Sequence, residues 1–432
     1  MRAMKDSGIE WIGEVPQNWL TKKLKYCVDL RLQKTADKAA STSYIGLEHV
    51  TSFIGTLCKD YEAITDFNGD TLDFCEGDVL FGKLRPYLAK AYQAKDNGRC
   101  SSEFWVMNPT GIEGRYLLYY VLSHGFISDI DHSTFGVKMP RAEWSFAGNE
   151  KIPFPSLAEQ HRISEYLDTK CAEIDALIAA KEKTNALLRE RRQSIIYEAV
   201  TKGLDPNAPM KDSGVEWIGE ISEGWKTVRI KHVIDRSEYG IKIGPFGSTL
   251  ANRTLISGPY NVYSQANLIS NSFSDTNHHI DGNTFDDLRG YEVKPGDVCV
   301  SMMGTIGKCR VVPAGITKGI MDSHLIKIRL DEEQIDPRFF EYVYDKDNSG
   351  VCYTQMQYEK KGTIMDGLNT AIVKNLVIPL PPLTDQVVIS NYLDTKCAES
   401  NALICKNGQE IRKLKEYRQS LIYEAVTGKI EV

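Results

Sequence analysis

The chain has 432 residues, of which 42% are hydrophobic and 25% are charged, and its formal net charge is −6 at pH 7. These values describe an ordinary globular protein that is long enough for two domains. The acidic balance argues against a simple basic coat for nucleic acid, so binding to DNA would need a local basic face or a partner that supplies positive charge.

The ten cysteines are scattered along the chain, and no two of them form a C-x-x-C pair. Free thiols in a reducing cytoplasm explain this pattern better than disulfides or a zinc site do. The first residues, MRAMKDSGIEWIG, lack the apolar core of a secretory signal, and no run of 18 apolar residues occurs. We therefore expect a cytoplasmic protein that does not contact a membrane.

The first predicted element is an opening segment, residues 4–19, which begins MKDSGIEWIGE and returns as MKDSGVEWIGE at residue 210. The divergent middle that follows, residues 20–151, contains TLDFCEGDVLFGKLRPYLAKAYQA, which predicts short strands with a G-D turn. RYLLYYVLSHGF, at 115–126, predicts a helix whose aromatic residues belong to the core rather than to a cofactor site.

A closing segment, residues 152–203, begins IPFPSLAEQ and contains neither Gly nor Pro from Leu157 to Thr201. Strong helix formers dominate it, so it predicts one helix of about 45 residues and roughly 65 Å. Its apolar residues recur at roughly heptad spacing, at Ile163, Leu167, Ile174, Leu177, Ile178, Leu188 and Ile195.

The second half of the chain repeats this order. A linker and second opening segment (204–225) precede a second middle (226–377), which contains YEVKPGDVCVSMMGTIGKCRVV and the helical PRFFEYVYDK at 337–346. The second closing segment, 378–432, begins IPLPPLTDQ and keeps YLDTKCAE unchanged at 392–399. Its stripe consists of Ile389, Leu393, Leu403, Ile404, Ile411, Leu414 and Leu421.

The repeat predicts domains at 1–151 and 226–377, with spacer helices at 152–203 and 378–432. A long amphipathic helix cannot bury its stripe alone, so we expect the two helices to pack against each other. The alternative is that each helix packs only on its own domain. The predicted fold class is α+β: two mixed α/β domains joined by two long helices in an antiparallel coiled coil, with an internal pseudo-twofold repeat. Trp11, Trp19, Trp217 and Trp225 are expected to anchor the domains to the helices.

A search for catalytic motifs finds none that is complete. GTIGKC, at 304–309, departs from the P-loop pattern because Met302 and Cys309 replace required residues. No G-x-G-x-x-G follows a strand. The Asp-x-Lys of LDTK lies on both predicted helices, where a solvated or interface helix face explains it. The eight histidines show no metal-binding spacing. By elimination, we interpret the chain as a binding subunit without metal, cofactor or catalytic residues.

The whole layout resembles the specificity subunit of type I restriction-modification systems. The resemblance covers essentially the entire chain and is carried by DSGIEWIGEVPQNW, DSGVEWIGEISEGW, GPFGSTL (244–250), GDVLFGKLRPYLAK (77–90), IPFPSLAEQ and IPLPPLTDQ. It implies two target recognition domains, each reading one half of a bipartite sequence in double-stranded DNA, and a helix pair that sets the unread spacer. It also implies two methyltransferase subunits and two motor-nuclease subunits as partners, with S-adenosylmethionine, ATP and Mg on those partners.

Cationic and polar side chains are the groups that contact phosphates and base edges. The predicted DNA contacts are Lys83, Arg85, Tyr87, Lys90, Arg99, Lys138 and Arg141 in the first domain, and Lys242, Ser248, Arg253, Lys308, Arg310, Lys360 and Lys361 in the second. An ordinary exposed charge is the alternative for each lysine. Ser101–Ser102 and Asp322–Ser323 are either contacts or strand turns.

Partner contacts are expected on the repeated helix faces, at Tyr166, Tyr197, Tyr392 and Tyr423, although helix packing would equally explain their repetition. Two other classes of function stay open. One is a self-sufficient DNA-modifying enzyme with an unfamiliar active site, and the other is a coiled-coil scaffold that binds only protein.

Overall fold

The computed structural model describes residues 2–32, 34–35, 43–58, 61, 70–134, 138–237, 240–250, 253–274, 276–359 and 367–432. The chain divides into two compact units. The first comprises residues 1–182 and 408–432, and the second comprises residues 183–407. Each unit therefore includes part of both long helices. The units divide inside these helices, whereas the domain boundaries predicted from the sequence, at 151/152 and 377/378, lie before them.

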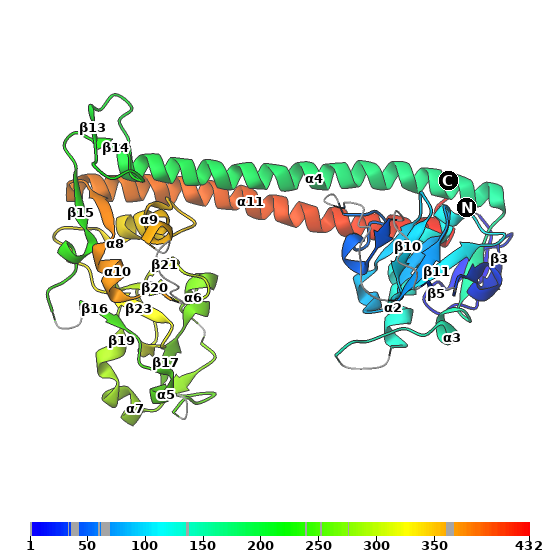
Figure 1. The fold of residues 1–432 in the computed structure, drawn as a ribbon, viewed down its shortest axis with the longest axis horizontal. Helices are drawn as coiled ribbons and strands as arrows, with labels where there is room; N and C mark the ends of the chain where they lie inside the picture. Colours follow the sequence, from blue (N-terminus) through cyan, green and yellow to red (C-terminus); the bar gives the residue numbers. More distant parts are fainter. Residues whose placement is uncertain are drawn as a thin grey trace. The chain divides into compact units, whose positions relative to one another are not determined.

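The first unit contains a mixed set of short strands and helices, drawn below the long helices in Figure 1. Its strands are β1 Met4–Asp6, β2 Glu14–Pro16, β3 Leu20–Lys23, β4 Val28–Leu30, β5 Lys34–Thr35, β6 Tyr44–Ile45, β7 Thr71–Phe74, β8 Val79–Gly82, β9 Ala91–Gln93, β10 Gly98–Ser101, β11 Phe104–Pro109 and β12 Lys151–Phe154. Its helices are η1 Leu24–Tyr26, η2 Leu47–His49, η3 Pro86–Leu88, α1 Gly114–Val121, α2 His124–His132 and α3 Trp144–Ala147, followed by α4 Leu157–Lys202.

The second unit follows the same plan with different loops (Figure 1). Its strands are β13 Met210–Asp212, β14 Glu220–Ser222, β15 Lys226–Arg229, β16 Ile241–Ile243, β17 Tyr260–Tyr263, β18 His279–Ile280, β19 Glu292–Val293, β20 Val298–Ser301, β21 Cys309–Val311, β22 Gly319–Met321, β23 Leu325–Ile328 and β24 Val377–Leu380. Its helices are η4 Ile230–His232, α5 Gly247–Leu250, α6 Gln265–Ser270, α7 Gly282–Asp287, η5 Arg289–Tyr291, α8 Pro337–Tyr344, α9 Val351–Glu359 and α10 Thr370–Asn375, followed by α11 Leu383–Val426.

The sheets confirm the internal repeat. In the first unit the order β4-β11-β8-β9 forms one antiparallel sheet, and β16-β23-β20-β21 is its counterpart in the second unit. Each unit adds a second four-stranded sheet that contains one parallel pair, β6 with β10 and β17 with β22. In each unit a two-stranded sheet, β3 with β12 or β15 with β24, joins the start of the domain to its end. The fold is therefore mixed α/β in both units, as predicted.

The predicted G-D turns are present and are held by a buried carboxylate. Gly77 and Gly296 adopt φ values of 88° and 86°, which a glycine reaches without strain. The carboxylates of Asp78 and Asp297, each 1% exposed, accept a hydrogen bond from a backbone amide within the same turn. An arginine pairs with each carboxylate, Arg31 in the first unit and Arg329 in the second, so that neither carboxylate is buried without a partner.

The two long helices pair in antiparallel fashion inside each unit. In the first unit Arg418 of α11 lies 3.0 Å from Asp175 of α4, and Lys181 pairs with Glu410 further along. In the second unit Arg192 donates to Asn401 at 2.7 Å. Partner numbers fall on α11 as they rise on α4, which confirms the predicted orientation. The alternative, in which each helix packs only on its own domain, is not sufficient, because each helix packs both on its domain and on the other long helix.

Two leucines of the predicted stripes were assigned to the wrong face. Leu177 is 53% exposed, and its counterpart in the second repeat, Leu403, is 52% exposed. The physical reason is angular, since three residues advance an α-helix by about 300° and so place Leu177 well to one side of the buried Ile174. Both leucines therefore lie on an outer face of their helices.

Each domain is fixed to its long helix by a repeated set of polar contacts. Gln160, the last residue of IPFPSLAEQ, is fully buried and accepts a hydrogen bond of 2.7 Å from the backbone amide of Glu113, which caps α1. Gln386 is also fully buried and accepts one of 2.8 Å from Asp336, which caps α8. A buried amide side chain must find partners, and this requirement explains why the repeats share a glutamine here.

About two helical turns further along, an aspartate in each repeat accepts hydrogen bonds from an arginine and a tyrosine of the domain. Asp168 receives them from Arg115 and Tyr119, at 2.6 Å each. The LDTK aspartates are thus structural anchors, which agrees with the reading of LDTK as part of a helix face. We call Asp168 with its two donors the first clamp; Asp394, with Arg338 and Tyr342, forms the second clamp.

Three of the four tryptophans expected to anchor the domains lie against a long helix, namely Trp11, whose ring centroid is 6.1 Å from that of Tyr423, and Trp19 and Trp225. The ring centroid of Trp217 lies 5.4 Å from that of Tyr358 on α9. Trp19 is 1% exposed and belongs to the same core as Leu421 and Val426 at the end of α11. Trp225 is 5% exposed and belongs to the same core as Val200 at the end of α4. Each opening segment therefore rests on the end of the helix that belongs to the other repeat.

Each of these helix ends is followed by a glycine in the left-handed region. Gly203 has a φ of 86° and Gly428 has a φ of 71°. An added Cβ at Gly203 would lie 3.2 Å from the Trp225 ring, and one at Gly428 would lie 2.5 Å from Pro16. Glycine is needed at these two positions both for the turn that ends the helix and for the close approach of the opening segment.

Candidate nucleic-acid interface

Five of the predicted DNA contacts in the first unit lie on two adjoining loops, residues 83–88 and 138–142. An isolated β-bridge joins Leu84 to Arg141, and the amide of Arg85 donates to the carbonyl of Pro140 at 2.8 Å. These contacts bring Lys83, Arg85, Tyr87, Lys138 and Arg141 to one part of the surface. Arg85, Tyr87, Lys138 and Arg141 are exposed, and Lys83 is half-buried. Arg141 is paired with Glu103 at 2.7 Å, so the positive charge of this local basic face comes from Lys83, Arg85 and Lys138, on a chain whose net charge is negative.

Two other residues predicted in the first unit are engaged elsewhere. The Nζ of Lys90 donates to the carbonyl of Leu47 at 2.6 Å. Arg99 lies on β10, in the other sheet, where its Nε is 3.4 Å from the carboxylate of Asp73. These intradomain contacts favour a structural role for Lys90 and Arg99, and their contact with DNA stays a prediction.

In the second unit Lys308 and Arg310 come together in an ion-pair network beside α8. Arg310 lies 2.6 Å from Asp345, which is fully buried, and 3.4 Å from Glu341. Lys308 pairs with Asp347. Because acidic groups within the domain already neutralise both cations, they contribute little positive potential to the surface.

The remaining predictions in the second unit are spread over several elements. Lys242 of β16 lies 4.1 Å from the centroid of the Tyr291 ring, a cation–π contact. Arg253 is 3.0 Å from Asp287 on the surface. The side chain of Ser248 and all of Lys360 and Lys361 lie outside the described residues.

The turns at Ser101–Ser102 and Asp322–Ser323 are strand turns, one of the two alternatives weighed for them. The amide of Glu103 donates to the Ser101 hydroxyl at 3.2 Å, and the amide of His324 donates to the Asp322 carboxylate at 2.9 Å. Burial raises the pKa of Asp322, while the hydrogen bond from the His324 amide lowers it. The sequence did not identify Glu103 or His324, because neither belongs to a basic or aromatic pattern.

The four tyrosines predicted to contact partners have different surroundings. Tyr197 and Tyr423 donate their hydroxyls to carbonyls of the opening segments, those of Ile218 at 3.0 Å and Trp11 at 3.3 Å. Tyr166 is half-buried against the first core, and Tyr392 is 38% exposed. Packing within the chain therefore explains why Tyr197 and Tyr423 are repeated. Contact with a partner stays a prediction for all four tyrosines.

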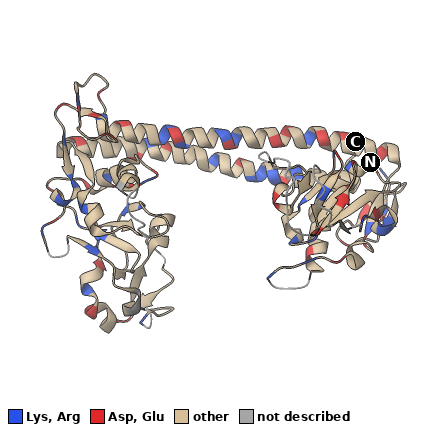
Figure 2. Ribbon diagram, viewed as in Figure 1, with Lys and Arg blue, Asp and Glu red and all other residues tan. Residues whose placement is uncertain are grey.

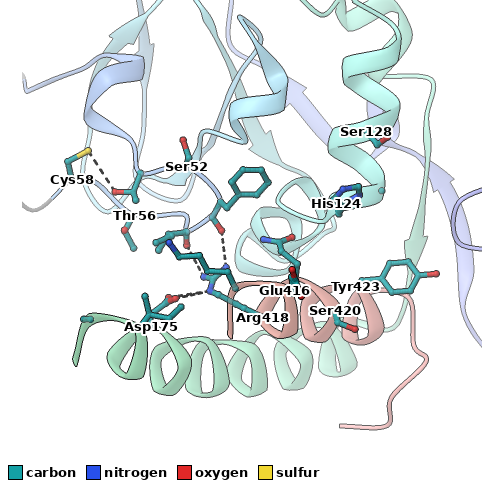
Figure 3. Close-up of a pocket in the computed structure, with 18 of the residues that line it drawn as sticks. Ser52, Thr56, Cys58, His124, Ser128, Asp175, Glu416, Arg418, Ser420 and Tyr423 are labelled. Carbon is teal, nitrogen blue, oxygen red and sulfur yellow. Dashed lines mark hydrogen bonds and ion pairs between the residues drawn. The ribbon is translucent and has the colours of Figure 1, made fainter. Parts of the chain in front are cut away.

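A cavity of about 1480 Å³ lies in the first unit between the loop 51–58, α2 and the helix pair. Arg418 lines it and donates to the carbonyls of Phe53 at 2.8 Å and Ile54 at 3.3 Å, while also pairing with Asp175 (Figure 3). Tyr423 lines the cavity at one side. A large concave surface that includes a predicted docking residue makes this cavity a candidate docking groove of the first unit.

An outer face of each long helix carries the same four residues in both repeats. On α4 they are Tyr166, Lys170, Glu173 and Leu177; on α11 they are Tyr392, Lys396, Glu399 and Leu403. Steps of four, three and four residues keep the four side chains on one side of a helix. The lysine pairs with the glutamate in both copies, at 2.8 and 3.0 Å. We call these sets the repeated faces; Figure 2 shows charges of both signs along the helices that carry them.

Within the described part of the chain, no group of three or more His, Cys, Asp or Glu side chains is placed to hold a metal ion. Among the same residues, no helix is long and apolar enough to cross a membrane.

Comparison with known proteins gives a consistent result. The family model described as the type I restriction modification DNA specificity domain matches residues 16–187 and 223–413. The MjaVIII type I restriction enzyme specificity subunit of Methanocaldococcus jannaschii is 25% identical over 73% of this chain and 70% of its own length. The EcoBI specificity subunit of Escherichia coli is 24% identical over 72% of this chain and 65% of its own.

The fold also matches a solved structure that addresses complex assembly and conformational transition of the type I R-M system. The TM-score is 0.70 at 18% sequence identity, over 96% of this chain and 99% of that one. At this level of identity the match concerns the fold.

Proposed function

Because the chain belongs to the family of type I restriction-modification DNA specificity proteins, we propose that it is the non-catalytic subunit that selects the DNA target of a restriction-modification complex. Each of its two domains reads one half of a bipartite sequence in double-stranded DNA. The helix pair sets the length of the unread spacer between the halves.

One observation carries this proposal: the two domains share their framework and differ in their exposed loops. The framework comprises the buried glutamines, the two clamps and the tryptophan anchors. On that common framework, the loop after β8 reads KLRPYLAK and its counterpart after β20 reads MMGTIGK. Such a design suits two readers of different sequences, because base readout depends on individual side chains at the surface while domain placement does not.

The two repeated faces support docking of two identical partners. In both repeats an exposed leucine shares its helix face with a tyrosine, which is half-buried at Tyr166 and 38% exposed at Tyr392, so a similar apolar contact is offered twice. We propose that two methyltransferase subunits dock there, and that two motor-nuclease subunits complete the restriction enzyme. S-adenosylmethionine, ATP and Mg then belong to the partners.

The docking proposal predicts the effect of a charge placed on one face at a time. Leu177→Lys leaves the fold unchanged, since the side chain is 53% exposed, and weakens binding of one methyltransferase copy. Leu403→Lys acts alike on the other copy, and the double variant binds neither. Native mass spectrometry of the purified complex counts the copies. Leu187→Lys, at another exposed leucine of α4 (55% exposed), is the control, and equal loss in that variant would contradict the assignment.

The function itself is tested by sequencing modified adenines in the DNA of cells that express this chain with its methyltransferase subunits. We expect modification at one bipartite sequence with a fixed spacer. Modification without such a sequence would refute the proposal. Purified chain alone, given DNA with S-adenosylmethionine or with Mg, separates the subunit from a self-sufficient enzyme, because methyl transfer or cutting without partners requires the latter. A scaffold that binds only protein would give no base-specific protection of DNA by the complex.

A further inference from the structure

The turns before β11 and β23 occupy the same place in the two domains. In the first unit the amide of Lys83, after β8, donates to the carbonyl of Glu103 at 2.9 Å. In the second unit the amide of Met302, after β20, donates to the carbonyl of His324 at 3.0 Å. In both turns the amide of the third residue donates to the side chain of the first, as described above. Glu103 and His324 are therefore equivalent positions on one backbone.

The equivalence extends to a third segment in each unit. The carbonyl of Lys83 accepts from the amide of Ala142 at 2.9 Å, and the carbonyl of Met302 accepts from the amide of Leu368 at 2.8 Å. Each turn thus lies beside the loop after β8 or β20 and beside the chain that leads toward the closing segment. Three segments held by the same hydrogen bonds form a rigid base for the side chain of the third turn residue, which is 23% exposed for Glu103 and 50% exposed for His324.

In the first unit the Glu103 carboxylate is held in place by Arg141. Two hydrogen bonds, of 3.0 and 2.7 Å, join the guanidinium to both carboxylate oxygens. The hydrogen bonds to Glu103 are the main cause of the raised pKa of Arg141. The pair lies in the wall of a hollow of about 490 Å³, which Lys83, Ser102 and Trp144 also line. Here an acceptor is fixed among cations that offset its repulsion from DNA phosphates.

In the second unit the equivalent side chain is an imidazole. The His324 side chain is 50% exposed, and its Nδ1 lies 3.5 Å from the Asp322 carboxylate. The neighbouring loop presents Met303, which is 41% exposed, in place of the cationic residues of the first unit. The same backbone therefore presents an acidic acceptor in one domain and a ring nitrogen beside an apolar side chain in the other.

We infer that Glu103 and His324 are specificity-determining residues, each contacting a base edge in its own half of the target; this inference rests on the proposed function. A carboxylate accepts a hydrogen bond from an exocyclic amino group, the N4 of cytosine or the N6 of adenine. Glu103 accordingly selects a base that presents an amino group in the major groove. His324 occupies the matching position in the other half-site.

The test uses the assembled complex and duplexes in which each base pair of the mapped target is replaced in turn. Glu103→Gln keeps the size of the side chain but adds a donor, so we expect its preference to change at one base pair of one half-site, by roughly 10- to 100-fold. His324→Ala changes one base pair of the other half-site only. Glu76→Ala removes a carboxylate at the opposite end of β8, where Glu76 is exposed, and leaves both half-sites unchanged.

The outcomes are distinguishable. If the wild-type complex has no bipartite preference, the proposed function fails before the variants are compared. If the wild type is specific but Glu103→Gln and His324→Ala read the same bases as it does, the inference is overturned and the function stands. An equal loss of binding on every duplex also overturns the inference, because a residue that only maintains the fold affects all sequences alike. Thermal unfolding of each variant verifies that the units remain folded.

Discussion

At the scale of single residues, the two repeats place an arginine at the same position and use it differently. Arg418 is 4% exposed and bonds to Asp175 and to two carbonyls of the loop 51–58. Its counterpart Arg192 donates to the neutral side chain of Asn401 at 2.7 Å and to one carbonyl, that of Asp347, at 3.4 Å. The loop needs such support because Phe53 has a φ of 63°, a conformation that costs a residue with a side chain about 1–2 kcal/mol.

Replacing Arg418 with alanine is expected to destabilise the first unit by about 3 kcal/mol, since Asp175 and two carbonyls lose a charged donor. Arg192→Ala is the matched control and costs about 1 kcal/mol in the second unit, because a neutral amide loses less. Hydrogen exchange measures both effects, and amides near Phe53 should exchange faster only in Arg418→Ala. Unchanged protection of that loop would show that Arg418 does not support it.

At the scale of elements, the two clamps determine how each domain is held on its long helix. Burial is the main reason that the pKa values of Tyr119 and Tyr342 are raised, so both phenols remain neutral donors to the aspartates. Each aspartate thereby joins one turn of the long helix to α1 or α8. This arrangement separates two tasks, since exposed loops can differ without altering the contact that orients the domain.

Asp168→Ala removes the acceptor of the first clamp. Because the Asp168 side chain is 44% exposed, we expect a loss of only about 1 kcal/mol in the free energy of unfolding. The larger effect is on targets: modification should spread to sites with neighbouring spacer lengths while both half-sites stay the same. Thr169→Ala, one residue further, is the control. A changed base within a half-site would show that the clamp does more than orient the domain.

At the scale of the whole molecule, the two long helices belong to both compact units. Each helix passes from one unit to the other near residues 182 and 408, where the units divide. The proposed function makes this stretch the part that sets the spacer. An insertion there leaves the contacts inside each unit intact, which is the condition for testing the spacer separately from the bases.

Seven residues inserted after Glu182, together with seven before Gly408, add two helical turns and roughly 10 Å of rise to both helices. We expect the spacer to lengthen by up to about three base pairs, at 3.4 Å each, with both half-sites unchanged. Mapping of modified adenines measures this directly. The same insertion placed in the linker 204–209 should leave the spacer length unchanged. An unchanged spacer in the helix variant would refute the proposal that the helix pair sets its length.

Much of this architecture could be predicted because it depends on local patterns. Each of three features specifies its structure through residues that are close in sequence: the long run of helix-forming residues, the G-D turns and the repeated segments. The candidate contacts were harder, since their surroundings come from distant parts of the chain. Arg310 is neutralised by Asp345, which directly follows α8, and Glu103 meets Arg141 from another loop. Such pairings follow from tertiary packing, which spacing along the chain does not reveal.

The opening segments rest on helix ends that belong to the other repeat, and this has a consequence for how such chains can be recombined. A gene fragment encoding a new first domain brings its own opening segment, but the helix end on which that segment rests remains that of the recipient. Trp19 must therefore fit the end of an α11 with which it was not inherited, as Trp225 must fit α4. Two genes can exchange domains only if they encode the same sequence where the opening segment contacts the helix end, whichever bases their products read. Such compatibility is a sufficient reason for the segment MKDSG-x-EWIGE to occur in both repeats.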